Sequence, residues 1–153
     1  MIFKQISFSL SDLAYAHFLI YPMAILILPI KTPRGILLMA GFTIGLIIDV
    51  FYDSLGVHAA ALVFTSYIRN LILAFLEPYE GYNTDDIPTF KKMGSGWMIS
   101  YLSIALFIHC FLYFSIESFS YVYFFEIFLN TIATFFVSIL VMLISLLIFR
   151  PKY

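Results

Sequence analysis

Residues able to do chemistry gather in one stretch of the chain, where they lie in or beside long apolar segments. The most informative of them are Asp49, His58 and Arg69. A charge at the centre of a bilayer costs about 3 kcal/mol or more, so a charged residue in such a segment usually has a role. A carboxylate and an imidazole can bond each other, exchange a proton or bind a metal.

Asp49 and His58 flank a predicted turn. Asp49 precedes the turn by about one helical turn, His58 follows it, and Gly56 allows a tight bend between them. The two side chains can therefore face each other across a helical hairpin, with Asp53 in the same group. Three interpretations stay open: a hydrogen bond that fixes the hairpin, a contact site for a partner on the outer side, and metal or proton chemistry.

The residues of suitable type for binding a metal come from separate segments. They show no ligand spacing such as HxxxH. They are His17, Asp49, His58, His109 and Glu126. The sequence therefore predicts no metal and no cofactor.

Arg69 lies thirteen residues past Gly56, which is about 20 Å along a helix. At that distance it cannot easily meet Asp49 or His58. One interpretation is that its side chain snorkels to the nearer lipid headgroups. The other is that it locks helices together, by bonding a carbonyl or the turn from Lys31 to Arg34.

The composition predicts an integral membrane protein. Of the 153 residues, 63% are hydrophobic and 11% are charged, and the mean hydropathy is +1.02. Soluble domains are about 45–50% apolar and about 25% charged. The length suits a single transmembrane domain over residues 1–153.

Five apolar segments approach the length of about 20 residues that a membrane span needs. They are residues 13–30, 36–51, 57–76, 97–114 and 122–149, with approximate bounds. Open strands cannot cross a bilayer, so the segments predict an all-α bundle of five transmembrane helices. The polar stretch 77–95 predicts a surface loop with one short helix, capped by Asp85 or Asp86.

The basic residues predict the orientation. If the five helices cross the membrane in alternating directions, six basic residues at helix ends lie on one side of it and only Lys4 lies on the other. These residues are Lys31, Arg34, Lys91, Lys92, Arg150 and Lys152. The positive-inside rule makes that face cytoplasmic, so the C-terminus is inside and the N-terminus outside. An outside N-terminus without a signal is uncommon, and we therefore expect that a first helix is missing, through a late assigned start or a real loss.

Two patterns predict helix packing. Gly41 and Gly45 form a GxxxG, which lets a neighbouring backbone approach closely, and packing inside the bundle is favoured over dimerisation. On the last segment, polar residues recur every four positions and predict one polar face directed at other helices of this bundle or of another subunit. They are Glu126, Asn130, Thr134 and Ser138.

Several kinds of chemistry have no motif in the chain. It contains no P-loop, GxSxG, HExxH or CxxC, which predicts that it is not an enzyme. It also lacks a basic patch of the kind that binds nucleic acid, so no nucleic-acid partner is predicted.

The residues assembled above resemble MreD, the bacterial rod shape-determining membrane protein family. The stretch that carries the resemblance reads LPIKTPRGILLMAGFTIGLIIDVFYDSLGVHAAALVFTSYIRNLIL. Its landmarks are residues 31–34, Gly45, Asp49, Gly56, 58–61 and Arg69, followed by Glu80 to Tyr82. The resemblance runs from about Tyr15 onward and is specific between Gly45 and Arg69, whereas the last two helices match in hydropathy alone.

The resemblance implies a fold and a role. MreD-like proteins have six helices, lie in the inner membrane and have a fold similar to the substrate-binding subunits of energy-coupling-factor transporters. They act without known catalysis in peptidoglycan elongation, together with MreC, the MreB filament, the RodA glycosyltransferase and a class B penicillin-binding protein. We therefore expect a non-catalytic scaffold or regulator that acts through MreC. The alternative is the small-molecule-binding subunit of a vitamin importer.

Overall fold

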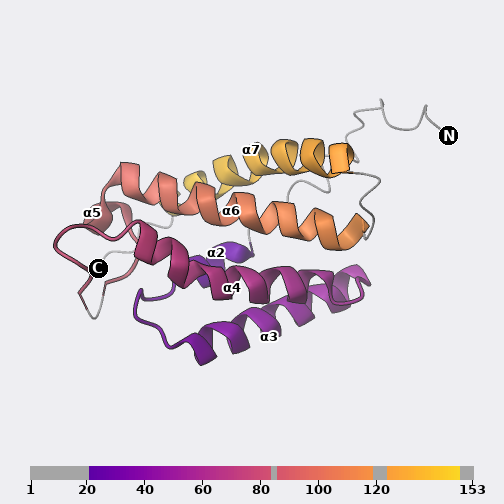
Figure 1. Cartoon of the computed structure of the whole chain (residues 1–153), viewed down its shortest axis with the longest axis horizontal. Helices are drawn as coiled ribbons and strands as arrows, with labels where there is room; N and C mark the ends of the chain where they lie inside the picture. Colours follow the sequence, from indigo (N-terminus) through magenta and orange to yellow (C-terminus); the bar gives the residue numbers. More distant parts are fainter. Residues whose placement is uncertain (1–20, 84–85, 119–123, 149–153) are drawn as a thin grey trace.

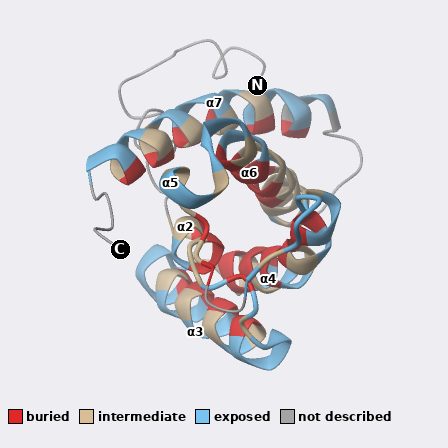
Figure 2. Ribbon diagram, turned by 90° about the vertical axis from the view of Figure 1, so that its left-hand side faces the viewer, coloured by how far each residue is buried: buried red, intermediate tan, exposed pale blue. Residues whose placement is uncertain are grey.

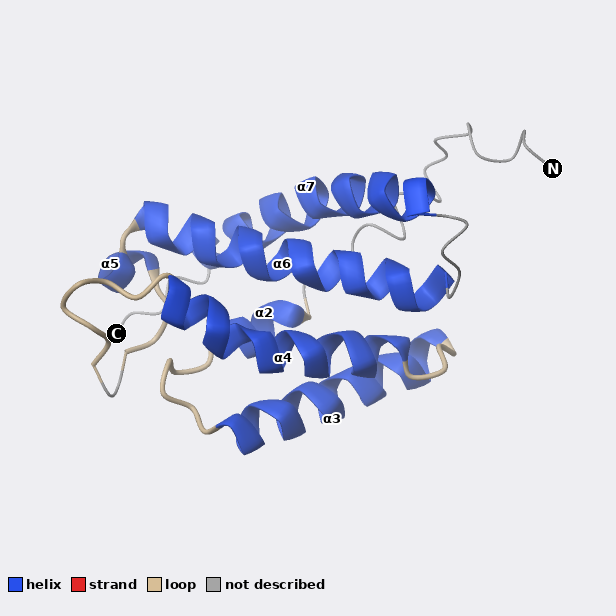
Figure 3. Cartoon of the chain, in the orientation of Figure 1, coloured by secondary structure: helices blue, strands red, loops and turns tan. Residues whose placement is uncertain are grey.

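The computed structural model describes residues 21–83, 86–118 and 124–148, with the side chains of residues 124 and 126 left out. Over these residues the chain is helical and contains no strand (Figure 3). The helices are α2 (Pro22–Leu26), α3 (Arg34–Tyr52), α4 (Val57–Phe75), α5 (Phe90–Met93), α6 (Ser95–Ser118) and α7 (Phe124–Ile148).

Four of these helices, α3, α4, α6 and α7, are long and apolar enough to cross a membrane. The shortest have 19 residues, which is about 28 Å at 1.5 Å per residue. The hydrocarbon core of a bilayer is about 30 Å thick. The described part of the chain is therefore an all-helical bundle with the dimensions of a membrane protein.

The first predicted segment, 13–30, differs from the structure in its described part. Its helix ends at Leu26, and the chain then makes turns up to Thr32. Leu28 precedes Pro29, and a residue before proline is disfavoured in the helical conformation. The helix therefore ends before the apolar run does. Residues 13–20 lie outside the described part.

The four long helices form a curved row, and α2 lies on its concave side (Figures 1 and 2). Along the row, α3 packs against α4, α4 against α6, and α6 against α7, while α2 contacts α3, α4 and α6. Ile25 and Leu26 of α2 are fully buried. Figure 2 shows the buried residues on the inward faces of the helices. The short helix α2 is thus the centre around which the row curves.

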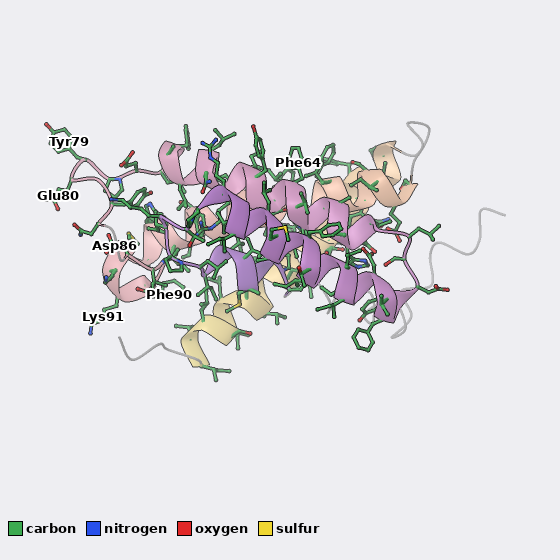
Figure 4. All side chains as sticks on the ribbon, turned by 90° about the horizontal axis from the view of Figure 1, so that it is seen from below. Phe64, Tyr79, Glu80, Asp86, Phe90 and Lys91 are labelled. Atoms are coloured by element: carbon green, nitrogen blue, oxygen red, sulfur yellow. The ribbon has the colours of Figure 1, made fainter. Side chains whose placement is uncertain are left out.

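The two ends of the bundle are different. The hairpin end carries the α3–α4 turn, residues 53–56, in which Asp53 and Gly56 both have a positive φ, of 52° and 84°. The loop end carries residues 77–83, residues 86–89 and α5, and Figure 4 shows Tyr79, Glu80, Asp86 and Lys91 together there. In the turn at the hairpin end, Gly56 adopts the left-handed conformation without steric cost, and an aspartate such as Asp53 tolerates it better than most residues.

The cap predicted for the short helix in the loop is wrong at Asp86. The N-cap of α5 is Thr89, and its side chain makes no capping hydrogen bond. The carboxylate of Asp86 instead accepts the Asn83 backbone N–H at 2.8 Å and the Lys92 ammonium at 3.1 Å. These two interactions, the Asn83 bond first, hold the pKa of Asp86 below its ordinary value. Pro88 disfavours the helical conformation of the residue before it, so the helix begins after Pro88 and Asp86 lies outside it. Asp85 lies outside the described residues.

Gly41 and Gly45 lie where α3 and α4 are closest. A Cβ atom added at Gly45 would be 2.3 Å from the Cα of Ala59, and one added at Gly41 would be 2.4 Å from the hydroxyl oxygen of Ser66. The GxxxG motif is therefore used for packing inside the chain. Only glycine lets the two helices approach this closely.

We predict that Gly45→Ala destabilises the protein, because the new methyl group would meet the backbone of α4 and force the two helices apart. Overpacking of this kind costs about 1–3 kcal/mol. The loss is measured as a lower thermal midpoint of the purified protein in detergent. Gly35→Ala, in the first turn of the same helix, is the matched control, because nothing lies within 4 Å of its added Cβ. Equal midpoints for the two variants would contradict the close approach of α3 and α4.

Candidate functional site

The hairpin lock, which consists of Asp49, Ser54 and His58, joins α3 to α4. The carboxylate of Asp49, 5% exposed, accepts the backbone N–H of His58 at 3.0 Å and that of Ala59 at 2.9 Å. It also accepts the Ser54 hydroxyl at 2.6 Å and lies 3.0 Å from Nδ1 of His58. The contact predicted between Asp49 and His58 is thus present, and it includes two backbone groups that sequence reasoning did not foresee.

The two backbone bonds make Asp49 the cap of a helix to which it does not belong. The first N–H groups of a helix have no partner within it. The residue at the N-cap of α4 is Gly56, which has no side chain to offer. The Asp49 carboxylate fills this place from α3, and its negative charge is favourable at the positive end of the α4 dipole.

The hydrogen bonds around His58 determine which of its two ring nitrogens carries a proton. The Ser54 hydroxyl has one proton, which it donates to Asp49, so its oxygen can only accept from Nδ1 of His58, 2.9 Å away. Nδ1 therefore carries a proton and donates to both Ser54 and Asp49. The imidazole lies among three tyrosine rings, with centroids 5.6 Å from Tyr21, 5.6 Å from Tyr52 and 5.0 Å from Tyr113.

A second group, the His109 chain, consists of Tyr21, His109 and Thr65. The Thr65 hydroxyl donates to the Ala61 carbonyl at 2.8 Å, so its oxygen accepts from Nδ1 of His109, also at 2.8 Å. Nε2 of His109 is then the acceptor for the Tyr21 hydroxyl at 2.8 Å. The His109 side chain is fully buried, which favours the neutral imidazole, so Nε2 carries no proton and accepts. The hydrogen bonds of the His109 chain join the start of α2 to α4 and α6.

A third group is the Arg69 cluster. It consists of the side chains of Arg69 and Tyr101 and of three backbone carbonyls at the end of α2 and just after it, those of Leu26, Leu28 and Pro29. Arg69 is 0% exposed; its Nε donates to the Tyr101 hydroxyl at 3.0 Å, and its Nη2 donates to the carbonyls of Leu28 and Pro29. The Tyr101 hydroxyl in turn donates to the Leu26 carbonyl at 3.0 Å. Snorkelling is therefore the wrong interpretation, and Arg69 locks helices by bonding carbonyls.

The Arg69 cluster works because α2 stops early. The last carbonyls of a helix have no partner within it, and a cation near them is favourable. Arg69 and Tyr101 supply donors from α4 and α6 to this end. Nη1 of Arg69 is buried and has no hydrogen-bond partner among the described residues. The apolar run continues past Leu26 to Ile30, so hydropathy alone did not predict that free carbonyls lie near Arg69.

The end of α4 is capped in the same way from the loop end. The Trp97 indole N–H donates to the Leu76 carbonyl at 2.7 Å, and the Tyr82 hydroxyl donates to the Leu73 carbonyl at 2.8 Å. Trp97 also stacks on Tyr101, with ring centroids 5.1 Å apart. Burial is the largest influence on the pKa of Tyr82 and raises it. Tyr82, a landmark of the resemblance, therefore has a structural role.

Other predicted site residues lie apart from these groups. Asp53 is exposed at the C-cap of α3, and Gly56 forms the turn. The polar face predicted on the last helix is split, because Thr134 is buried whereas Asn130 is exposed. A spacing of four residues advances by 400°, so the row drifts about 40° around the helix at each step. The side chain of Glu126 lies outside the described residues.

The three groups are suited to joining helices. In the part of the chain that the structure describes, no three His, Cys, Asp or Glu side chains come close enough to hold a metal ion. His17 lies outside that part. The polar groups described above are used mainly in hydrogen bonds between helices. No protein-family model, curated protein or solved structure matches this chain.

We predict that Asp49→Asn lowers the free energy of unfolding by about 2–3 kcal/mol, because an amide has one acceptor oxygen and leaves a buried N–H of α4 unpaired. Unfolding with a denaturing detergent, followed by circular dichroism, measures the loss. Asp53→Asn is the matched control: its side chain is exposed, and asparagine tolerates the left-handed conformation. A loss for Asp49→Asn no larger than that for Asp53→Asn would refute the cap.

We also predict that Arg69→Lys loosens the end of α2. A single ammonium cannot bond Tyr101 and the two carbonyls in the forked geometry of a guanidinium. The expected loss of stability is about 1–3 kcal/mol. Trp97, the only tryptophan, stacks on Tyr101, so its fluorescence should change as well. Arg34→Lys, at an exposed position, should change neither property. Unaltered fluorescence and stability in Arg69→Lys would be evidence against this role.

Proposed function

We propose that this chain is an MreD-type subunit of the bacterial cell-elongation complex, a non-catalytic scaffold and regulator in the inner membrane. The observation that carries the proposal is the use made of the residues that resemble MreD. Gly45 packs against Ala59, Asp49 caps α4 beside His58, and Arg69 holds the end of α2. These landmarks join helices, which is what a rigid scaffold requires.

The proposed topology has five spans. The first contains α2, and the others are α3, α4, α6 and α7. Basic residues at the loop end, Lys91 and Lys92 in α5 and Arg34 at the start of α3, support a cytoplasmic loop end. The hairpin end then faces outward, and the C-terminus lies in the cytoplasm. The overall fold is proposed to be similar to that of the energy-coupling-factor substrate-binding subunits.

In this role the bundle binds the transmembrane and juxtamembrane part of MreC. Through MreC it biases the synthase, formed by RodA and a class B penicillin-binding protein, toward an active arrangement alongside MreB. Asp49 and His58 are buried, so the contact uses the exposed turn around them. Leu55 is the strongest candidate, because its apolar side chain is fully exposed (101%) at the hairpin end.

The test is co-purification of MreC from the same bacterium with the tagged full chain. We expect MreC to be recovered with the wild type and with Tyr79→Asp, but at least five-fold less with Leu55→Asp. Tyr79 is the matched control, because it is equally exposed (107%) at the opposite end (Figure 4). Both substitutions put a carboxylate on a turn, outside the bundle core.

The outcomes separate the parts of this proposal. Failure of the folded wild type to recover MreC would overturn the function. Recovery of MreC with all three proteins would leave the function standing and place the contact away from Leu55. A vitamin or another small molecule bound to the purified chain, with no MreC recovered, would favour the importer subunit.

A further inference from the structure

Helix α7 carries an exposed stripe with a regular spacing. Its members follow one another at intervals of three, four, three, four and three residues, and all of them are exposed. They are Asn130, Ala133, Val137, Leu140, Ile144 and Leu147. This is the a and d pattern of a heptad repeat, which keeps one seam of a helix facing a partner helix.

The residue types at the two sets of positions are specific. The a positions hold Asn130, Val137 and Ile144, one polar and two β-branched, whereas the d positions hold Ala133 and two leucines. In parallel coiled coils, β-branched residues at a and leucine at d favour two strands. A single asparagine at an a position fixes the register and the number of strands.

The stripe is free to meet another molecule. In the described part of the chain α7 is the last helix of the row, and it packs mainly against α6. It does so through a different face, on which Thr131, Thr134, Ser138 and Met142 are buried. The seam from Asn130 to Leu147 is about 26 Å long, close to the thickness of the hydrocarbon layer.

Asn130 cannot be explained as a lipid-facing residue. It lies about 9 Å along the axis from the start of a helix about 37 Å long, which places it within the hydrocarbon layer. A polar side chain there needs a hydrogen-bond partner. An amide has both a donor and an acceptor, so the same amide on a second copy completes it. Ala133, one turn away, lets the two helices approach.

We infer that two copies of this chain form a parallel dimer through α7, with Asn130 paired to Asn130 near the hairpin end. Copies inserted in one membrane with the same topology present parallel α7 helices, related by a two-fold axis along the membrane normal. In that arrangement each a residue faces the same a residue, and each d residue the same d residue. Such a dimer does not require the function proposed above.

Oxidative cross-linking of the full chain in membranes tests the seam. Val137→Cys and Leu140→Cys should each give at least five-fold more disulfide-linked dimer than Phe128→Cys. Phe128 is exposed on the same helix but lies outside the seam, beyond the Cα separation of about 7 Å that a disulfide bridges. The native Cys110 is buried, so the unsubstituted chain gives the background. Equal yields at all three positions, or none, would overturn the dimer.

Energy transfer between labelled copies in liposomes tests Asn130 directly. Asn130→Leu should weaken dimerisation about 3-fold to 10-fold, judged from the protein-to-lipid ratio at half-maximal transfer. The control is Thr43→Val on α3, which removes a polar group from another exposed position. An unchanged ratio for Asn130→Leu would refute the pairing of the two amides. Cross-links from the seam to a different protein, in place of the dimer, would also overturn the inference.

Discussion

The Asp49 carboxylate at the start of α4 is the interaction on which the arrangement of α3 and α4 depends. It accepts two backbone N–H groups that Gly56 cannot serve, together with the Ser54 hydroxyl and the His58 imidazole. In a membrane-spanning bundle little water is available to satisfy free helix ends, and each unsatisfied group costs several kcal/mol. A carboxylate from the preceding helix removes that cost and fixes the hairpin at once.

The same constraint explains the other polar groups. The carbonyls at and after the end of α2 are bonded by Arg69 of α4 and Tyr101 of α6, and the end of α4 is bonded by Trp97 and Tyr82. In each case the donor comes from another part of the chain. Because each of these helix ends is capped by a side chain from another segment, the helices depend on one another for stability. This capping also explains why so apolar a sequence contains buried polar residues.

The contacts that could be predicted from the sequence join residues that are close together along the chain. Asp49 and His58 are nine residues apart, on either side of one turn, so their meeting followed from helix geometry. Gly41 and Gly45 likewise pack on the adjacent helix. The all-helical class followed from composition, because only helices or closed barrels satisfy the backbone in lipid.

Distant partners could not be predicted. His109 meets Thr65 and Tyr21 across 44 and 88 residues, and nothing in the periodicity of the chain specifies which helices are neighbours. The inward course of Arg69 depends on the early end of α2, a detail set by Pro29. The polar residues of α7 do not share one face, because a spacing of four residues advances about 40° beyond a full turn, and this drift separates Asn130 from Thr134.

The direction of the hydrogen bonds through His109 determines where this series of polar groups ends. The Tyr21 hydroxyl donates a hydrogen bond to His109, His109 donates one to Thr65, and Thr65 donates one to the Ala61 carbonyl. An amide carbonyl oxygen is a very weak base and has no proton of its own to hand on. The series of hydrogen bonds therefore ends at a backbone carbonyl of α4, and each hydroxyl or N–H proton in it is used in one hydrogen bond.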